Sequence, residues 1–330
     1  MTNPVQQDQF IQFMNSIGLP DLKQAAVAVA VSGGADSLAL AHLLNGWGEF
    51  KELHILSVDH GLRAESVDEV KLVRKFAKKI GAKFKSFKWL GDKPERSIQE
   101  AARVARYDLM EHYCASKKIG YLFLAHHGDD QVETFLFRLA KGSGLDGLGA
   151  MKPLQSYNDR LQLVRPLLAV GHEDLIATCE RAGIEWAEDP SNNSVKYMRG
   201  RMRGSRDALE SEGLTIRRVG QITTRLDRAR SFIDQYTEKK EEIIVLIKET
   251  NRIEIILSEL RKEHSEVIIR IIRNSIRRLV PHTPYPPRLE DMERLADRIA
   301  RPDFRGATLG GVKFVVRKRD DLLELLLEKF

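Results

Sequence analysis

The sequence has almost no cysteine and no long apolar stretch. Its 330 residues include two cysteines, Cys114 and Cys179, which form no CxxC pair. This excludes an iron–sulfur site, a structural zinc ribbon and a disulfide scaffold, and it favours a reducing, cytoplasmic setting. The longest apolar run is residues 25–31, whereas a membrane span needs about 20 residues. The first residues have neither a basic region nor an apolar segment, so neither a membrane partner nor a secretory signal is expected.

Basic residues slightly outnumber acidic residues, and the excess is concentrated in one segment. The net charge is +6, from 53 basic and 47 acidic residues. Residues 196–230 hold ten basic and four acidic side chains, so this segment accounts for the whole excess. An arginine-weighted block between neutral regions is typical of a surface that contacts a phosphate backbone. A solvated basic helix face is the alternative.

The first 190 residues or so alternate strand and helix patterns. We expect strands at 25–31, 53–58, 82–87 and 121–125, and helices at 36–44, 66–80, 98–116 and 130–139. This alternation predicts a doubly wound, mostly parallel α/β sheet. Ligands bind such sheets at the carboxyl ends of the strands, where the polar motifs of this chain also lie.

The rest of the chain has a different pattern. Residues 203–247 are helical and strongly charged, and residues 251–330 predict a small α+β unit. That unit has a strand at 253–257, helices at 266–280 and 288–301, and a hairpin at Gly310-Gly311. The predicted domains are therefore 1–205, a helical linker at 206–248, and 249–330.

A glycine loop follows the first expected strand: Ser32, Gly33, Gly34, Ala35, Asp36 and Ser37. Glycines allow a sharp turn, and backbone amides with a helix N-terminus can surround an anion. The loop lacks the GK[ST] of a Walker A motif and is not a GxGxxG sequence. Without a lysine for a transferring γ-phosphate, it suits pyrophosphate recognition and attack at an α-phosphate. A tight turn that binds nothing is the alternative.

Two carboxylates share one face of an expected helix. Asp130 and Glu133 are three positions apart, and His126, His127 and Asp129 are close by. A carboxylate pair can hold an ammonium group and accept its proton. The spacing is not HExxH, and neighbouring histidines converge poorly on one zinc, so a zinc hydrolase is disfavoured. A helix N-cap is the structural alternative for Asp130.

Three further side chains are candidates for nucleotide contacts. Arg103 and Arg106 lie three positions apart on the helix at 98–116 and could neutralise phosphate. A solvated helix face explains the two arginines equally well. His60 directly follows the second strand, where a nucleotide contact competes with a capping or core role.

The hexapeptide at 32–37 resembles the pyrophosphate loop of the ATP-pyrophosphatase (N-type, PP-loop) superfamily. Four further segments narrow the resemblance: VDHGLR at 58–63, AARVARY at 101–107, LAHHGDDQVET at 124–134 and EDPSN at 188–192. In this order they are similar to the tRNA(Ile)-lysidine synthetases. The resemblance covers about residues 25–205.

The resemblance implies an ATP-dependent ligase that acts on RNA. Its partners would be free L-lysine and an isoleucine tRNA with a CAU anticodon, contacted in part by the C-terminal domain. Asp130 and Glu133 fall where lysine recognition and proton acceptance are expected. Asp36 falls where Mg²⁺ is held with the ATP phosphates, with help from Asp130, and His60 falls in the nucleotide pocket. A homodimer stays open.

The chain departs from the family pattern at one point. An Arg-Asn-Arg type of run is expected after EDPSN, whereas this sequence has Arg199, Gly200, Arg201, Met202 and Arg203. Arg201 is the first choice for the arginine that meets the reacting groups, and Arg199 is the second. A thiolating or amidating relative and a non-catalytic RNA-binding module remain as alternatives. The missing CxxC disfavours thiolation, and a phosphate loop beside paired carboxylates disfavours a binding module.

Overall fold

The chain folds into two compact units. The computed structural model describes residues 2–59, 66–89, 98–187, 206–249, 251–281, 287–317 and 321–327. The first unit comprises Met1–Ser143 and Gly147–Thr224, and the second comprises Gly144–Asp146 and Arg225–Phe330. The predicted domain limits at residues 205 and 248 stay a prediction.

The first unit is built on a six-stranded sheet in the order β3-β2-β1-β4-β6-β5. All neighbouring strands run parallel except β5, which pairs antiparallel with β6. The strand order reverses between β1 and β4, because β2 and β3 extend one way and β4 begins the other half. The predicted doubly wound, mostly parallel sheet is therefore confirmed. The bounds are β1 Ala26–Ala30, β2 Glu52–Asp59, β3 Lys83–Lys88, β4 Tyr121–Phe123, β5 Leu154–Ser156 and β6 Gln162–Val164.

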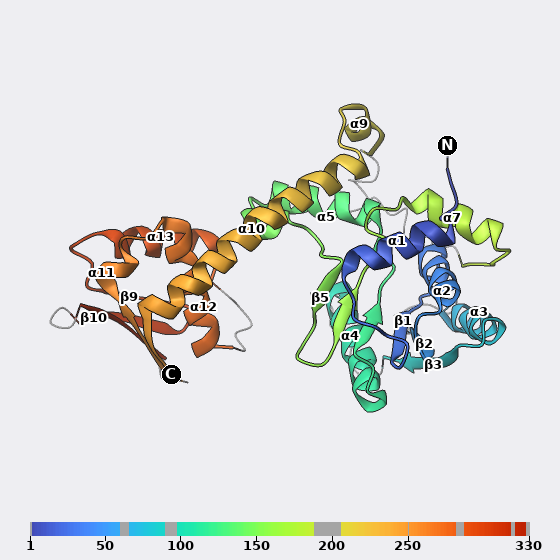
Figure 1. Cartoon of the computed structure of the whole chain (residues 1–330), viewed down its shortest axis with the longest axis horizontal. Helices are drawn as coiled ribbons and strands as arrows, with labels where there is room; N and C mark the ends of the chain where they lie inside the picture. The colour runs from blue at the N-terminus through green and yellow to red at the C-terminus, as the bar shows by residue number, and fades with distance from the viewer. Residues whose placement is uncertain are drawn as a thin grey trace. The chain divides into compact units, whose positions relative to one another are not determined.

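Helices cover both faces of this sheet (Figure 1). One core packs α1, α2, α3 and α7 against the sheet, and a second core packs α4 on the other face. In β1, Val27 and Val29 enter the first core while Ala28 enters the second, all without exposure. This two-sided burial explains the unbroken apolar run at 25–31. The bounds are α1 Gln7–Ile17, α2 Ala35–Trp47, α3 Ser66–Lys79, α4 Ile98–Lys117, α5 Gly128–Ala140, α6 Leu145–Leu148 and α7 His172–Arg181.

The second unit is an antiparallel sheet packed with helices, as the α+β pattern predicted. Its strand order is β7-β8-β11-β10-β9, and the apolar sides of α12 and α13 complete one core. The predicted hairpin joins β9 to β10, with Gly310 at φ +60° and Gly311 at φ +76°. Two positive φ angles are what a tight hairpin turn needs. Two helices precede this sheet in the chain: α9 Arg206–Ser211 belongs to the first unit, and α10 Ile216–Ile244 has residues in both units. The bounds of the other elements are β7 Val245–Lys248, β8 Arg252–Ile256, α11 Leu257–Leu260, α12 Ser265–Leu279, α13 Leu289–Ala300, β9 Gly306–Leu309, β10 Val312–Arg317 and β11 Leu322–Leu327.

Among the described residues, no helix combines the length and the apolar character that crossing a bilayer requires.

Candidate functional site

The glycine loop turns the chain from β1 into α2. Gly33 has φ +103°, a region that residues with a side chain rarely adopt. The hydroxyl of Ser37 donates to the carbonyl of Gly34 at 3.0 Å and accepts from the amide of Ser32 at 3.1 Å. Gly34 is the N-cap of α2, and no side chain caps it. The predicted residues Ser32 to Ser37 therefore form one fixed turn at an open helix N-terminus, which is suited to an anion.

Three segments that follow parallel strands meet beside this loop. Asp36, in the first turn of α2, has Oδ1 2.7 Å from Nδ1 of His172 at the start of α7. Nε2 of His127, which precedes α5, lies 3.6 Å from Oδ2 of Asp36 and 3.6 Å from Oδ2 of Asp130. The rings of His127 and His172 stack with centroids 5.4 Å apart. The convergence follows β1, β4 and β6 and lies where the strand order reverses, the expected ligand position in such sheets.

The start of α5 positions the predicted carboxylates. The helix begins at Gly128, so Asp130 is its third residue, and its Oδ2 accepts the backbone N–H of His127 at 3.1 Å. The N-cap of α5 is His127, so Asp130 is not the N-cap itself but the N3 arm of a capping box. Its carboxylate is still 27% exposed. Glu133 is buried one turn further along α5. Asp129, also buried, accepts the backbone N–H of His172 at 2.8 Å.

The carboxylates stabilise positive charge on the two stacked histidines. Burial alone would lower the pKa of His127, but its contact with Asp129 and the charges of Asp130 and Asp36 raise that pKa above its ordinary value. The hydrogen bond to Asp36 likewise raises the pKa of His172. The negative charge of these carboxylates therefore favours the protonated form of both rings.

Three side chains of this cluster lie close enough together to bind one metal ion. A carboxylate oxygen of Asp36 and ring nitrogens of His127 and His172 lie within 4.8 Å of one another. His126 and His127 are neighbours in sequence, whereas the structure brings His127 together with His172. The carboxylate oxygens of Asp36 and Asp130 are the donors here that fit the oxygen preference of Mg²⁺.

Three arginines lie close enough to His126, the residue before His127, to act on its charge. Nε of the buried Arg165, just after β6, lies 3.3 Å from Nδ1 of His126. Burial and then the charges of Arg165, Arg103 and Arg106 lower the pKa of His126 to about 3. Arg103 and Arg106 both lie over the ring of Tyr107, at 5.4 and 5.7 Å. In the part of the chain that the structure describes, no carboxylate pairs with these three arginines. Uncompensated positive charge of this kind suits an anionic ligand.

The structure adds two residues to the predicted site, and some of the predicted residues lie outside the part of the chain that it describes. His60, Arg199, Arg201 and Arg203 lie outside the described residues. His172 and Arg165 were not predicted as site residues. The available signals were their positions, since Arg165 directly follows an apolar strand and His172 follows the N-cap glycine of α7.

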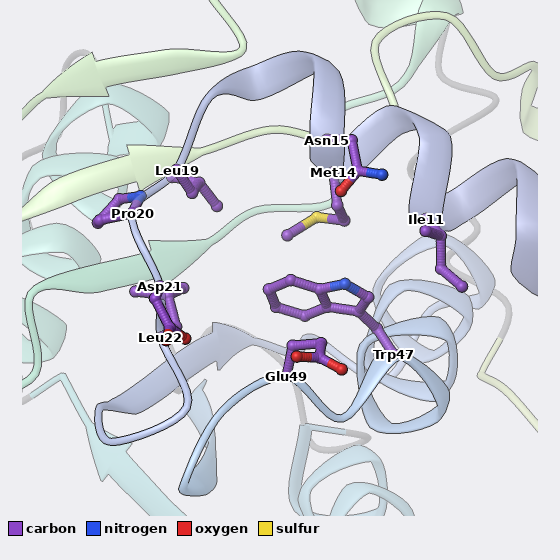
Figure 2. A pocket seen from close by; sticks show the side chains of 9 residues that line it. All are labelled: Ile11, Met14, Asn15, Leu19, Pro20, Asp21, Leu22, Trp47 and Glu49. Atoms are coloured by element: carbon purple, nitrogen blue, oxygen red, sulfur yellow. The ribbon is translucent and has the colours of Figure 1, made fainter.

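A separate pocket of about 440 Å³ lies between α1, the loop after it and the end of α2. Figure 2 shows Met14, Trp47 and Glu49 among the side chains around it. Trp47 is the last residue of α2 and Asp36 lies in its first turn, so the helix rise separates them by ~16 Å. None of the predicted site residues lines this pocket.

Comparisons with known proteins agree with this geometry. The family described as the PP-loop domain matches residues 2–206. The tRNA(Ile)-lysidine synthase of Wolbachia sp. subsp. Brugia malayi is 36% identical over 308 residues, which are 92% of this chain and 70% of that protein. The tRNA(Ile)-lysidine synthase of Wolbachia pipientis wMel is 34% identical over 96% of this chain and 74% of that protein.

A solved structure shares the fold of the first unit. The U34-tRNA thiolase NcsA from Methanococcus maripaludis superposes with a TM-score of 0.56 over 67% of this chain and 79% of that chain, at 21% identity. This likeness concerns the fold alone. The resemblance first noted in the phosphate loop is therefore confirmed across most of the sequence, and the chain belongs to the PP-loop proteins and, within them, to the tRNA(Ile)-lysidine synthase family.

Proposed function

We propose that the chain ligates L-lysine to the wobble cytidine of an isoleucine tRNA with a CAU anticodon, with ATP converted to AMP and pyrophosphate. One observation carries the proposal. Asp36 and Asp130 come from different segments, and each has a carboxylate oxygen 3.6 Å from Nε2 of His127, beside the open N-terminus of α2. A helix N-terminus suited to the phosphates of a nucleotide thus adjoins carboxylates suited to a cation. The names of the relatives support the choice of tRNA and lysine.

The first step activates the cytidine. Its 2-carbonyl oxygen attacks the α-phosphorus of ATP, a new oxygen–phosphorus bond forms, and the bond to the departing pyrophosphate breaks. The loop at 32–37 holds the leaving pyrophosphate through backbone amides and the α2 N-terminus. Arg106 and Arg165 supply positive charge to the phosphates. Activation is needed because a cytosine carbonyl oxygen is a poor leaving group, whereas AMP is a good one.

The second step transfers lysine. Its ε-amine attacks carbon 2 of the activated ring, and the bond to the AMP oxygen breaks. The attacking amine must be neutral, although a free lysine side chain has a pKa of about 10.4. Asp130 and Glu133 hold the ammonium group and accept the proton it loses. Glu133 is 7% exposed, so a charge on the lysine side chain would be held away from bulk water.

Mg²⁺ belongs to the proposed site. Asp36 and Asp130 would hold it through carboxylate oxygens, the ligand type that Mg²⁺ prefers. When bound, the ion supplies positive charge that offsets the phosphates of ATP. Because the substrates are ATP, lysine and tRNA, the proposal places the chain in the cytoplasm.

The thiolating alternative finds no support in the two cysteines. Cys114 and Cys179 are both buried, in separate cores on opposite faces of the sheet. Burial raises the pKa of each thiol to about 12. Neither thiol is therefore suited to carry sulfur to a substrate or to bind a cluster.

The test is pyrophosphate release from ATP with tRNA present and with lysine added or omitted, together with lysine incorporation into the tRNA. The proposal expects release that depends on tRNA and lysine that becomes attached to it. Pyrophosphate release without any lysine incorporation would contradict the ligase function.

A further inference from the structure

Arg165, in the first unit, is a buried arginine that is held by neutral groups. It is 4% exposed. Its Nη1 donates to the backbone carbonyl of Lys152 at 3.0 Å and to Oε1 of Gln155 at 3.1 Å, and its Nε donates to Nδ1 of His126 at 3.3 Å. In the segments that the structure describes, no carboxylate forms an ion pair with it. Its charge is therefore fixed in place and not neutralised.

A buried arginine of the second unit shows the opposite arrangement. Arg270 is 1% exposed, and it pairs with the carboxylates of Asp234 and Glu266 within its own unit. Burial lowers the pKa of Arg165, whereas the carboxylates around Arg270 outweigh its burial and raise the pKa of that arginine. A buried charge with no counter-charge destabilises a folded protein strongly. The neutral surroundings of Arg165 therefore suit a charge that is reserved for a ligand.

The hydrogen bond to Arg165 fixes the form of the His126 ring. An arginine N–H is always a donor, so the nitrogen that it meets must be an acceptor without a proton. Nδ1 of His126 is that acceptor, and the neutral ring then carries its proton on Nε2. The imidazole thus orients the guanidinium without adding a negative charge.

The backbone after β4 gives the two neighbouring histidines different surroundings. His127 has φ −123° and ψ −176°, which is extended backbone, and successive side chains of an extended segment point to opposite sides. His127 accordingly meets the carboxylates of Asp36 and Asp130, whereas His126 meets Arg165. A carboxylate cluster and an arginine cluster are thus held by adjacent residues.

Two more arginines add positive charge at the same place. Arg103 and Arg106 lie over the ring of Tyr107, a side chain that also interacts with Arg165. Like charges held this close favour an anion that can contact several of them, and the planar fork of a guanidinium matches the oxygens of a phosphate group.

We propose that His126 is a positioning residue, whose neutral Nδ1 orients Arg165 and leaves the full charge of its guanidinium for a phosphate group. A carboxylate at position 126 would hold Arg165 as firmly but would neutralise it. The phosphate belongs to ATP or to the tRNA backbone, and the choice between these two ligands rests on the function proposed above.

The test compares three substitutions of His126 by equilibrium binding and Tm. H126L removes the acceptor and should weaken binding of the phosphate ligand by about 10-fold, as is usual when the partner of a ligand-binding side chain is lost. H126Q keeps a neutral acceptor and should bind within about threefold of the wild type. H126E pairs with Arg165, so its Tm should not fall, yet its binding should be at least as weak as that of H126L. H112E adds the same charge at an exposed position of α4 and should bind as the wild type does.

Separate Kd values for ATP and for an unmodified tRNA transcript identify the source of the phosphate. A loss of affinity for ATP assigns it to ATP. A loss of affinity for tRNA, with a slope of log Kd against log salt that is smaller by about 1, assigns it to the RNA backbone. Either result supports the role of His126.

The contrary results are equally specific. Binding of both ligands by H126E at wild-type strength would overturn the role of His126, and so would a loss in H126Q as large as that in H126E. These two variants decide the matter even if H126L does not fold. A wild-type chain that binds ATP and tRNA but never attaches lysine would refute the proposed function, and the binding data would still decide the role of His126.

Discussion

Asp36 and His172 are 136 residues apart in sequence, and Oδ1 of Asp36 lies 2.7 Å from Nδ1 of His172. The backbone N–H of His172 donates to Asp129 at 2.8 Å. His172 therefore connects the phosphate loop, α5 and α7 within the first unit. A residue in this position orients the carboxylate that we expect to face the ATP phosphates.

Replacing His172 tests this orienting role. In H172A the carboxylate of Asp36 loses its fixed partner, so tRNA-dependent pyrophosphate release should slow by about 10- to 100-fold, as is usual when a partner of a phosphate or metal ligand is lost. H112A is the control, because His112 is exposed on α4. If H172A released pyrophosphate at the wild-type rate, the orienting role would be wrong.

Glu133 should matter more for the second step than for the first. E133Q removes the charge that we expect to hold the ammonium group and accept its proton, and it keeps the size of the side chain. Lysine transfer should fall by about 10²-fold or more, while pyrophosphate release in the absence of lysine should fall much less. E180Q, at an exposed position of α7, is the control. Equal losses in both steps would contradict the assignment.

The basic segment should contribute to tRNA binding through phosphates. Arg217 and Arg218 are exposed at the start of α10. The double variant R217Q/R218Q should weaken tRNA binding and reduce the slope of log Kd against log salt by about 1 to 2. The matched control K78Q/K79Q removes two exposed charges from α3. If binding and slope stayed at their wild-type values, the basic block would be a solvated face.

Both cysteines should be unreactive in the folded protein. Burial raises the pKa of Cys114 and of Cys179 to about 12, so at pH 8 about one thiol in 10,000 would be thiolate. Ellman's reagent at pH 8 should label neither thiol in the native chain and both after unfolding in guanidinium. Rapid labelling of the native chain would show that a thiol is accessible and would reopen the thiolating alternative.

Local patterns predicted much of the fold. The apolar run at 25–31 predicted β1 because that strand is buried on both faces. The glycines at 32–34 predicted the turn because the conformation of Gly33 demands one. The three-residue spacing of Asp130 and Glu133 predicted their shared helix face. In each case the signal and its cause lie within a few residues of one another.

The features that local sequence patterns do not predict depend on distant parts of the chain. His172 acquires its role from Asp36, and nothing near residue 172 indicates that partner. Arg165 is buried just after β6, a strand that pairs with the distant β4. Strand β5 is short and mostly exposed, so it lacks the apolar pattern of a parallel strand. The anchoring of Asp146 on α12 joins residues 124 positions apart, a pairing that no local pattern predicts.

The most direct test of the proposed function is incorporation of labelled L-lysine into two unmodified transcripts, isoleucine tRNA with a CAU anticodon and methionine tRNA with the same anticodon. With ATP and Mg²⁺ present, we predict that label accumulates in the isoleucine transcript, is lost when its wobble cytidine is replaced by uridine, and is far lower in the methionine transcript. No label in the isoleucine transcript under conditions where the chain binds both ATP and tRNA would contradict the proposed function.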